Sequence, residues 1–366
     1  MFSVLLICLA AIVFVNCISY AVFGNYTFSK SETATKKTSV PISVIVCAKN
    51  EAENLRKNVP HILAQSYLNF ELILINDASS DETLDIIKSF AEQDSRVKYV
   101  DVVNNEAFWA NKKYSLTLGI KKAKNNYLLF TDADCRPDSP NWIQEMANHF
   151  ADRKELILGY GPYESKPSLL NRLIRFETVM TAIQYFSFAK AGSPYMGVGR
   201  NLAYTNKLFY DTRGFMSHMN IRSGDDDLFV NEAGTKNNTA ICDIPESFVY
   251  SEPKKTWKSW MHQKKRHIST ASNYKKKHQF LLTTYFLFNV LFWIGLISAY
   301  LFLDWKYVTV LVAFRFIMKY VFVGKGILRL REKGLLAILP LLELLLIFFQ
   351  LRIFIANIFS KPKHWK

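Results

Sequence analysis

The chain has 366 residues, of which 50% are hydrophobic and 21% charged. An apolar content this high excludes an intrinsically disordered chain, which cannot bury enough apolar surface to offset its ordering entropy. The formal net charge of +15 favours an anionic partner: a nucleic acid, a phosphorylated ligand or a membrane surface. The five cysteines contain no CxxC pair, so the sequence implies neither a disulfide framework nor a structural zinc site.

The first 23 residues contain no charged side chain and lack the basic region that opens a cleaved signal peptide. Because a helix of about 20 apolar residues crosses the hydrocarbon core, we expect an uncleaved transmembrane anchor over 1–23, followed by a linker over 24–39. The first charges are Lys30, Lys36 and Lys37, so the positive-inside rule places the next domain in the cytoplasm. We therefore expect an integral protein of an inner or plasma membrane.

Residues 40–252 alternate short apolar runs with helical stretches and are numerous enough to bury one core. The predicted strands are 43–47, 72–75, 97–103 and 127–130, and the predicted helices are 53–66, 82–93, 112–124 and 168–189. Ser80 is the predicted cap of the second helix. Strand, helix and strand in this order indicate right-handed βαβ units, and therefore an α/β fold with a mostly parallel sheet.

Residues 253–279 are rich in lysine and arginine and include Trp257 and Trp260. Basic and aromatic side chains beside a membrane span are typical of interfacial helices on an anionic membrane surface. This position accounts for the charge better than nucleic acid does, so we expect no nucleic-acid partner.

Residues 280–359 are expected to hold two to three further transmembrane helices. The apolar runs are 280–303, 307–323 and 334–359, with a basic loop over 325–333. One of the last two runs could instead be re-entrant or lie on the membrane surface. Residues 360–366 form a basic tail.

Polar and acidic residues follow three of the predicted strands. They are Ala48, Asn50 and Glu51 after the first strand, Asp77 after the second, and Asp132 and Asp134 after the fourth. Each cluster alone could be a turn, since Asn, Asp and Ser favour turns. Ligands bind at the carboxyl ends of parallel strands, however, and an Asp-x-Asp at such an end suits Mg²⁺ or Mn²⁺ together with a phosphate.

Six motifs in this order resemble the family 2 glycosyltransferases, whose nucleotide-sugar domain has the GT-A fold. They are PISVIVCAKNEAENL (41–55), LINDASSDET (74–83), NKKYSLTLGI (111–120), TDADC (131–135), SGDDDLF (223–229) and QKKRH (263–267). The resemblance implies a GT-A domain over 40–252 and basic interfacial helices with a QxxRH motif over 253–279. It further implies membrane-anchored, inverting transfer from a nucleotide-diphosphate sugar, with UDP as the expected nucleotide.

The resemblance also implies roles for individual residues. The residues implied to bind the donor are Ala48, Asn50, Glu51, Asp77, Lys112, Asp132, Gln263 and Arg266. The adjacent Lys113 could match the family's lysine in place of Lys112, because the alignment is open by one residue. Asp134 and Asp132 match the metal motif for Mg²⁺ or Mn²⁺. The acceptor side is implied at Gly197, Gly199, Arg200, Asn201 and His267. His267 stands where the family has a tryptophan, which favours a single addition over processive synthesis.

Inverting transfer to a hydroxyl needs a base within about 3 Å of the acceptor oxygen. Alignment on Leu228 makes Asp225 this base, with Asp226 as the alternative. Neighbouring carboxylates raise one another's pKa, but an acidic helix N-terminus would explain the triplet 225–227 equally well.

The expected function is transfer of a sugar to a hydroxyl of a lipid-linked or saccharide acceptor in the formation of cell-envelope polysaccharide. Two alternatives stay open. A polyprenyl-phosphate sugar transferase would need no strong base, because its acceptor is already anionic. A non-catalytic membrane scaffold with the same fold would need none of the site residues.

Overall fold

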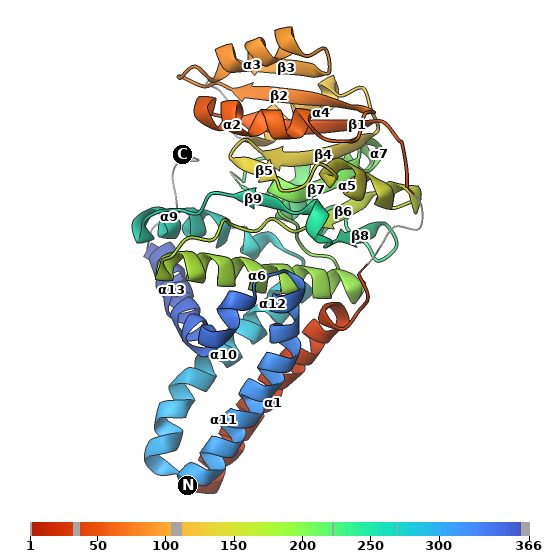
Figure 1. Cartoon of the computed structure of the whole chain (residues 1–366). Coiled ribbons are helices and arrows are strands. Elements are labelled where there is room, and N and C mark those ends of the chain that lie inside the picture. Colours follow the sequence, from red (N-terminus) through yellow and green to blue (C-terminus); the bar gives the residue numbers. More distant parts are fainter. Residues whose placement is uncertain (1, 32–36, 104–111, 222, 269, 360–366) are drawn as a thin grey trace. The chain divides into compact units, whose positions relative to one another are not determined.

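The computed structural model describes residues 2–31, 37–103, 112–221, 223–268 and 270–359 (Figure 1). They fall into two compact units. The α/β unit contains residues 31–164 and 192–254, and the helical unit contains residues 2–30, 165–191 and 255–359. Each unit is therefore assembled from stretches that are distant in the sequence.

Among its described residues, the α/β unit contains a sheet of seven strands in the order β3-β2-β1-β4-β7-β6-β8. The strands are β1 (Ile42–Ala48), β2 (Phe70–Asp77), β3 (Val97–Val102), β4 (Tyr127–Asp132), β6 (Leu156–Gly159), β7 (Leu202–Thr205) and β8 (Thr239–Cys242). All neighbours are parallel except β7, which is antiparallel to β4 and β6. The mostly parallel sheet predicted from the sequence is confirmed. Separately, β5 (Cys135–Pro137) pairs with β9 (Val249–Ser251).

The helices of the α/β unit are α2 (Ala52–Leu63), α3 (Thr83–Gln93), α4 (Lys112–Lys122), α5 (Trp142–Ala151), α7 (Asn206–Asp211) and α8 (Asp227–Ala233). The predicted cap of α3 is wrong. The backbone N–H of Thr83 donates to Asp81 at 3.1 Å, whereas the backbone N–H of Ser80 donates to Asn50 Oδ1 at 2.8 Å. Ser80 is thus used to join the loops that follow β1 and β2.

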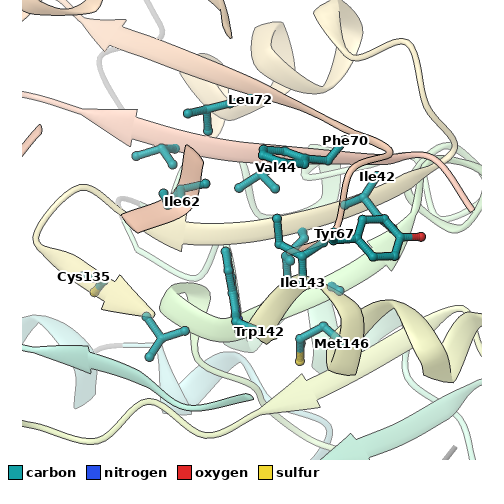
Figure 2. Packing of buried hydrophobic residues seen from close by; sticks show 14 of the residues in the cluster. Ile42, Val44, Ile62, Tyr67, Phe70, Leu72, Cys135, Trp142, Ile143 and Met146 are labelled. Atoms are coloured by element: carbon teal, nitrogen blue, oxygen red, sulfur yellow. The ribbon is translucent and has the colours of Figure 1, made fainter. Parts of the chain in front are cut away.

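Alternate side chains of the parallel strands face opposite sides of the sheet, as the period of a strand requires. Val44 and Leu72 pack in one buried cluster with Trp142 of α5 (Figure 2). On the opposite face α4 lies so close that a Cβ added to Gly119 would collide with the side chain of Ile75. Because helices cover both faces of the parallel strands, their carboxyl ends are the part of the sheet left for a ligand.

The helical unit contains α1 (Phe2–Thr27), α6 (Leu169–Lys190), α9 (Trp257–Ile268), α10 (Lys276–Phe302), α11 (Trp305–Lys319), α12 (Lys325–Arg329) and α13 (Leu339–Phe359). Four stretches of the described chain are long and apolar enough to cross a membrane: Val4–Thr27, Lys276–Phe302, Trp305–Arg329 and Lys333–Ala356. This agrees with one N-terminal and three C-terminal membrane helices.

The third candidate span differs from its prediction at one end. A π-helical turn, Tyr320–Gly324, joins α11 to α12 without a break. The helix therefore continues to Arg329, and the first part of the basic stretch 325–333 is helical rather than a loop.

A buried polar cluster joins the four candidate spans to one another. Arg315 of α11 donates through Nη2 to Glu343 Oε1 of α13 at 2.8 Å and to Asn289 Oδ1 of α10 at 2.8 Å. It also reaches Asn16 Oδ1 of α1 at 3.4 Å, and Lys319 forms a second ion pair with Glu343. Ionisable groups within membrane helices are costly unless they are paired, so these contacts fix the register of the four helices.

Candidate functional site

A small cavity opens at the carboxyl end of β4. Its lining comes from α4, from the ends of β4 and β7, and from the residues before α8. The lining residues are Lys112, Leu116, Phe130, Thr131, Asp132, Gly199, Leu202, Tyr204 and Asp225. Sequence reasoning gave no role to Thr131, although it opens the motif TDADC, or to Tyr204, because the strand β7 that carries Tyr204 was not predicted.

Lys112 is the first residue of α4, and its ammonium joins two acidic groups in this cavity. Nζ lies 2.7 Å from Asp132 Oδ1 and 3.2 Å from Asp225 Oδ2. Burial alone would lower the pKa of Lys112, but Asp132 and Asp225 outweigh burial and hold that pKa well above its usual value. Lys113 points elsewhere, and donates to the backbone carbonyls of His218 and Ile221. Of the two neighbouring lysines, Lys112 is the one that faces the cavity.

Asp132 ends β4, and Asp134 lies in the turn to β5. One oxygen of each and the Sγ of Cys135 lie within 4.8 Å of one another. Burial raises the pKa of Asp134, and the charges of Asp132 and Glu51 raise it further. A divalent cation would relieve this repulsion, and carboxylate oxygens are the ligands that Mg²⁺ and Mn²⁺ prefer. The carboxylates of Asp132 and Asp134 therefore fit such an ion. The thiol of Cys135 donates to Asp134 Oδ1 at 3.3 Å and is a soft group that these ions do not prefer.

The consecutive aspartates 225–227 have different surroundings. Asp226 precedes α8 and accepts two backbone hydrogen bonds, from the N–H of Asp227 at 2.7 Å and from that of Gly199 at 2.8 Å. Burial, followed by the charges of Asp225 and Asp227, raises the pKa of Asp226 to about 7. Asp225 stands before the helix and lines the cavity. The start of α8 thus accounts for carboxylates at Asp226 and Asp227. It does not account for Asp225, whose carboxylate belongs to the cavity.

The predicted donor-side residues at the ends of β1, β2 and β4 lie along one edge of the sheet. Register pairs Ala48 of β1 with Asn76 of β2, and Cys47 with Asp132 of β4, so the ends of these strands are level. Asp77, the last residue of β2, accepts a hydrogen bond from Ser115 of α4.

The loop after β1 is held in a fixed shape at the same edge. Asn50 has a φ of 54°, in the left-handed region that asparagine tolerates. Its backbone N–H donates to Ser79 Oγ at 3.0 Å, and that of Glu51 donates to Thr83 Oγ1 at 2.8 Å. The structure therefore brings Ala48, Asn50 and Glu51 to the edge that also carries Asp132.

The glycine-rich stretch before β7 contributes Gly199 to the cavity. Gly197 is enclosed by apolar side chains, with Leu202 3.0 Å from where its Cβ would be. The guanidinium of Arg200 lies 4.5 Å from the centre of the Tyr163 ring and donates to the carbonyl of Gly161. Of this stretch, Gly199 alone lines the cavity.

Asn201 lies beneath the site and does not line it. Its side chain is completely buried, and Nδ2 donates to the carbonyls of Tyr160 and Ser247, both at 2.8 Å. Its Oδ1 accepts from Trp142 Nε1 at 3.0 Å. Since all three bonds are internal, we assign Asn201 a supporting role in place of the predicted role on the acceptor side.

The QxxRH motif lies on α9 in the helical unit. Gln263 and Arg266 are partly buried, and the side chain of His267 lies outside the described residues. Trp257 and Trp260 both pack on Phe349 of α13, with ring centroids 4.8 and 5.5 Å apart respectively. The tryptophans predicted to be interfacial therefore attach α9 to a candidate membrane helix.

Comparison with known proteins identifies the family. Residues 43–221 match the model of glycosyl transferase family 2. An uncharacterized glycosyltransferase of Haemophilus influenzae is 31% identical over 122 residues, which make up 33% of this chain and 36% of that protein. The poly-beta-1,6-N-acetyl-D-glucosamine synthase of Staphylococcus aureus is 27% identical over 155 residues, 42% of this chain and 36% of that protein. The matched region thus spans little more than a third of the length of these relatives.

A solved structure extends the likeness in fold. The mannosyltransferase PcManGT from Pyrobaculum calidifontis, in complex with GDP-Man and Mn²⁺, matches 94% of this chain and 99% of its own with a TM-score of 0.62. At 16% sequence identity the likeness concerns the fold and not the activity. The chain therefore contains a glycosyl transferase family 2 domain of the GT-A type.

Proposed function

We propose that this protein is a membrane-bound inverting glycosyltransferase that transfers a sugar from a nucleotide-diphosphate donor to a hydroxyl of a lipid-linked or saccharide acceptor. The observation that carries this proposal is the contact of one ammonium, Lys112 Nζ, with both Asp132 and Asp225. This contact supports the proposal, because it brings Asp132 of the proposed metal motif and the proposed base Asp225 to the same side chain.

Departure of the diphosphate requires positive charge around it. A divalent ion at Asp134 and Asp132 would take up part of the charge that develops on the leaving oxygen. Lys112, whose pKa is held well above its usual value, remains a cation at neutral pH and supplies a preorganised positive group in the cavity. Gln263 and Arg266 are proposed as further contacts of the diphosphate, the guanidinium in bidentate fashion.

Asp225 is the proposed base. As the acceptor oxygen bonds to the anomeric carbon, its proton passes to the Asp225 carboxylate and the bond from that carbon to the diphosphate oxygen breaks on the opposite face. This geometry inverts the anomeric centre. Asp226 is less suited to the role, because both of its oxygens already accept backbone hydrogen bonds.

The nucleoside is proposed to lie along the edge formed by Ala48, Asn50, Glu51 and Asp77, with UDP as the nucleotide. The buried carboxylate of Asp77 can accept a hydrogen bond from a base or a ribose. Gly199 lines the cavity from the side that we assign to the acceptor. His267 is proposed to stand on that side as well, consistent with a single addition.

Attachment to an inner or plasma membrane is supported by the four candidate spans and by the lysines around α9. The domain predicted over 40–252 is proposed to face the cytoplasm. Formation of cell-envelope polysaccharide is the proposed setting.

The function is tested by nucleotide release from purified full-length protein in detergent, with a panel of nucleotide sugars and Mn²⁺ or Mg²⁺. We expect Asp134→Ala and Asp225→Asn each to lower release by about 10²-fold or more. Asp85→Asn, an exposed carboxylate of α3, is the matched control and should change nothing.

Three outcomes of this assay are informative. No release from any donor, or release that neither site variant lowers, would contradict the proposal and favour a scaffold. A loss in Asp134→Ala together with full release in Asp225→Asn would point to an anionic acceptor such as polyprenyl phosphate, because that acceptor needs no base.

A further inference from the structure

Lys113 is buried inside the α/β unit although it carries a charge. Its side chain is 1% exposed, and Nζ donates to the carbonyl oxygens of His218 at 2.7 Å and Ile221 at 2.9 Å. A lysine is almost never fully buried unless it is paired. The two carbonyls belong to residues 216–221, which we call the approach segment because it leads to Asp225.

The charges around Lys113 explain why an ammonium is held here. Asp225, Asp227 and Asp226 all attract it, although burial is the larger effect and lowers the pKa of Lys113 to about 8. Burial and the charge of Lys113 together lower the pKa of His218 to about 4, so the imidazole is neutral and does not compete for the carboxylates.

The approach segment is tied down on two sides and connects to Asp225 through few residues. Ser217 donates to Glu232 of α8, while Lys113 holds the segment to α4. Asp225 follows Ile221 by four residues, and Gly224 between them has a φ of 97°, which glycine adopts without strain. Because only three residues separate Ile221 from Asp225, the position of the segment limits where Asp225 can lie.

We propose that Lys113 is a positioning residue that holds the approach segment and thereby sets the place of the Asp225 carboxylate beside Lys112 and Asp132. The inference rests on the proposed function, because it takes Asp225 as the base. The first turn of α4 then has two separate tasks. Lys112 faces the cavity, and Lys113 fixes the backbone that presents the base.

Kinetics of Lys113→Met test this role, with exposed Lys121→Met of the same helix as the control. Methionine keeps the length of the side chain but cannot donate to the carbonyls. Because a displacement of about 1 Å costs on the order of 10²-fold in rate, we expect kcat to fall about 10- to 100-fold with little change in the KM for the donor. Lys112→Met should lower kcat as well but, unlike Lys113→Met, should also raise that KM, because Lys112 faces the cavity.

The conservative variant Lys113→Arg supplies a pH signature. The protonated lysine is present below about pH 8, so wild-type kcat should fall as the pH rises through that value. An arginine stays charged throughout, so Lys113→Arg should recover much of the activity and move the alkaline limb to higher pH. An alkaline limb at the same pH in both proteins would overturn the inference.

Hydrogen exchange separates this inference from the proposed function, because it needs no substrate. In Lys113→Met the amides of the approach segment should exchange faster than in wild type, while those of β1 and β2 stay unchanged. Unchanged exchange in the approach segment, or loss of donor binding together with turnover, would overturn the positioning role. Faster exchange in a protein whose wild type releases no nucleotide would count against the proposed function alone.

Discussion

Asn201 shows how a residue can lie inside a motif and still serve the fold. Its neighbour Gly199 lines the cavity, but Asn201 bonds only to Tyr160, Ser247 and Trp142. These three partners come from the end of β6, from α5 and from the chain before β9, which meet only in the folded protein. The sequence around Asn201 therefore does not reveal them. The sequence could therefore place this stretch beside the site, but it could not separate the residues that line the cavity from those that support it.

Replacement of Asn201 by alanine should destabilise the protein strongly. The change leaves two carbonyls and an indole N–H without partners, and each such buried group costs about 1–3 kcal/mol. We expect a loss of about 3 kcal/mol or more in the free energy of unfolding, measured by denaturant titration. Exposed Asn237→Ala is the control. A stable Asn201→Ala protein with weakened acceptor binding would restore the acceptor-side role.

Asp226 predicts a pH dependence of stability. Its pKa is raised to about 7 in the folded protein from about 4 in an unfolded chain. The folded state therefore gains from protonation of Asp226 below pH 4, and this gain is lost as the pH rises through 7. Because Asp226→Asn cannot titrate, the melting temperature of wild type minus that of the variant should fall between pH 4 and pH 8. A constant difference would contradict the raised pKa.

At the level of elements, the sequence predicted the helices and strands that are long or strongly apolar. The strands β1, β2 and β4 are uninterrupted buried runs, and α2, α3 and α4 lie between them at the spacing of βαβ units. It missed β5 and β9, which are three residues each and exist only because they pair with each other. The short antiparallel β7 was missed for the same reason, since its partners lie far away in the sequence.

The polar cluster of the candidate spans gives a prediction at this scale. Glu343→Met leaves Arg315 and Lys319 without their shared carboxylate, and removal of one partner from a buried ion pair costs about 3–5 kcal/mol. We expect a marked loss of thermal stability in detergent, followed by fluorescence-detected size exclusion. The triple replacement of Arg315, Lys319 and Glu343 by methionine should recover much of it. Equal stability of Glu343→Met and wild type would show that the cluster does not hold the helices together.

For the whole molecule, composition and charge indicated helices of membrane-spanning length at both ends of the described chain before any contact was known. The longest apolar runs lie in the helical unit, and the lysine-rich stretch 253–279 lies almost wholly in the same unit. What they could not give is the discontinuity of both units, because the segment 165–191 belongs to the helical unit although it interrupts the α/β unit in the sequence. The unit to which a segment belongs is decided by the residues it packs against and not by its local hydropathy.

This discontinuity has a consequence during synthesis. The ribosome releases α1 first, but the side chains that bond to Asn16 and its neighbours, among them Asn289 and Arg315, are made only near the end of translation. Until then Asn16 and Tyr20 can form only their bonds within α1, to the carbonyl of Ile12 and to Asn16 Oδ1 respectively. A chain that stops before Glu343 would leave Arg315 and Lys319 without their shared carboxylate, so the four candidate spans can complete their polar cluster only after the last of them has been made.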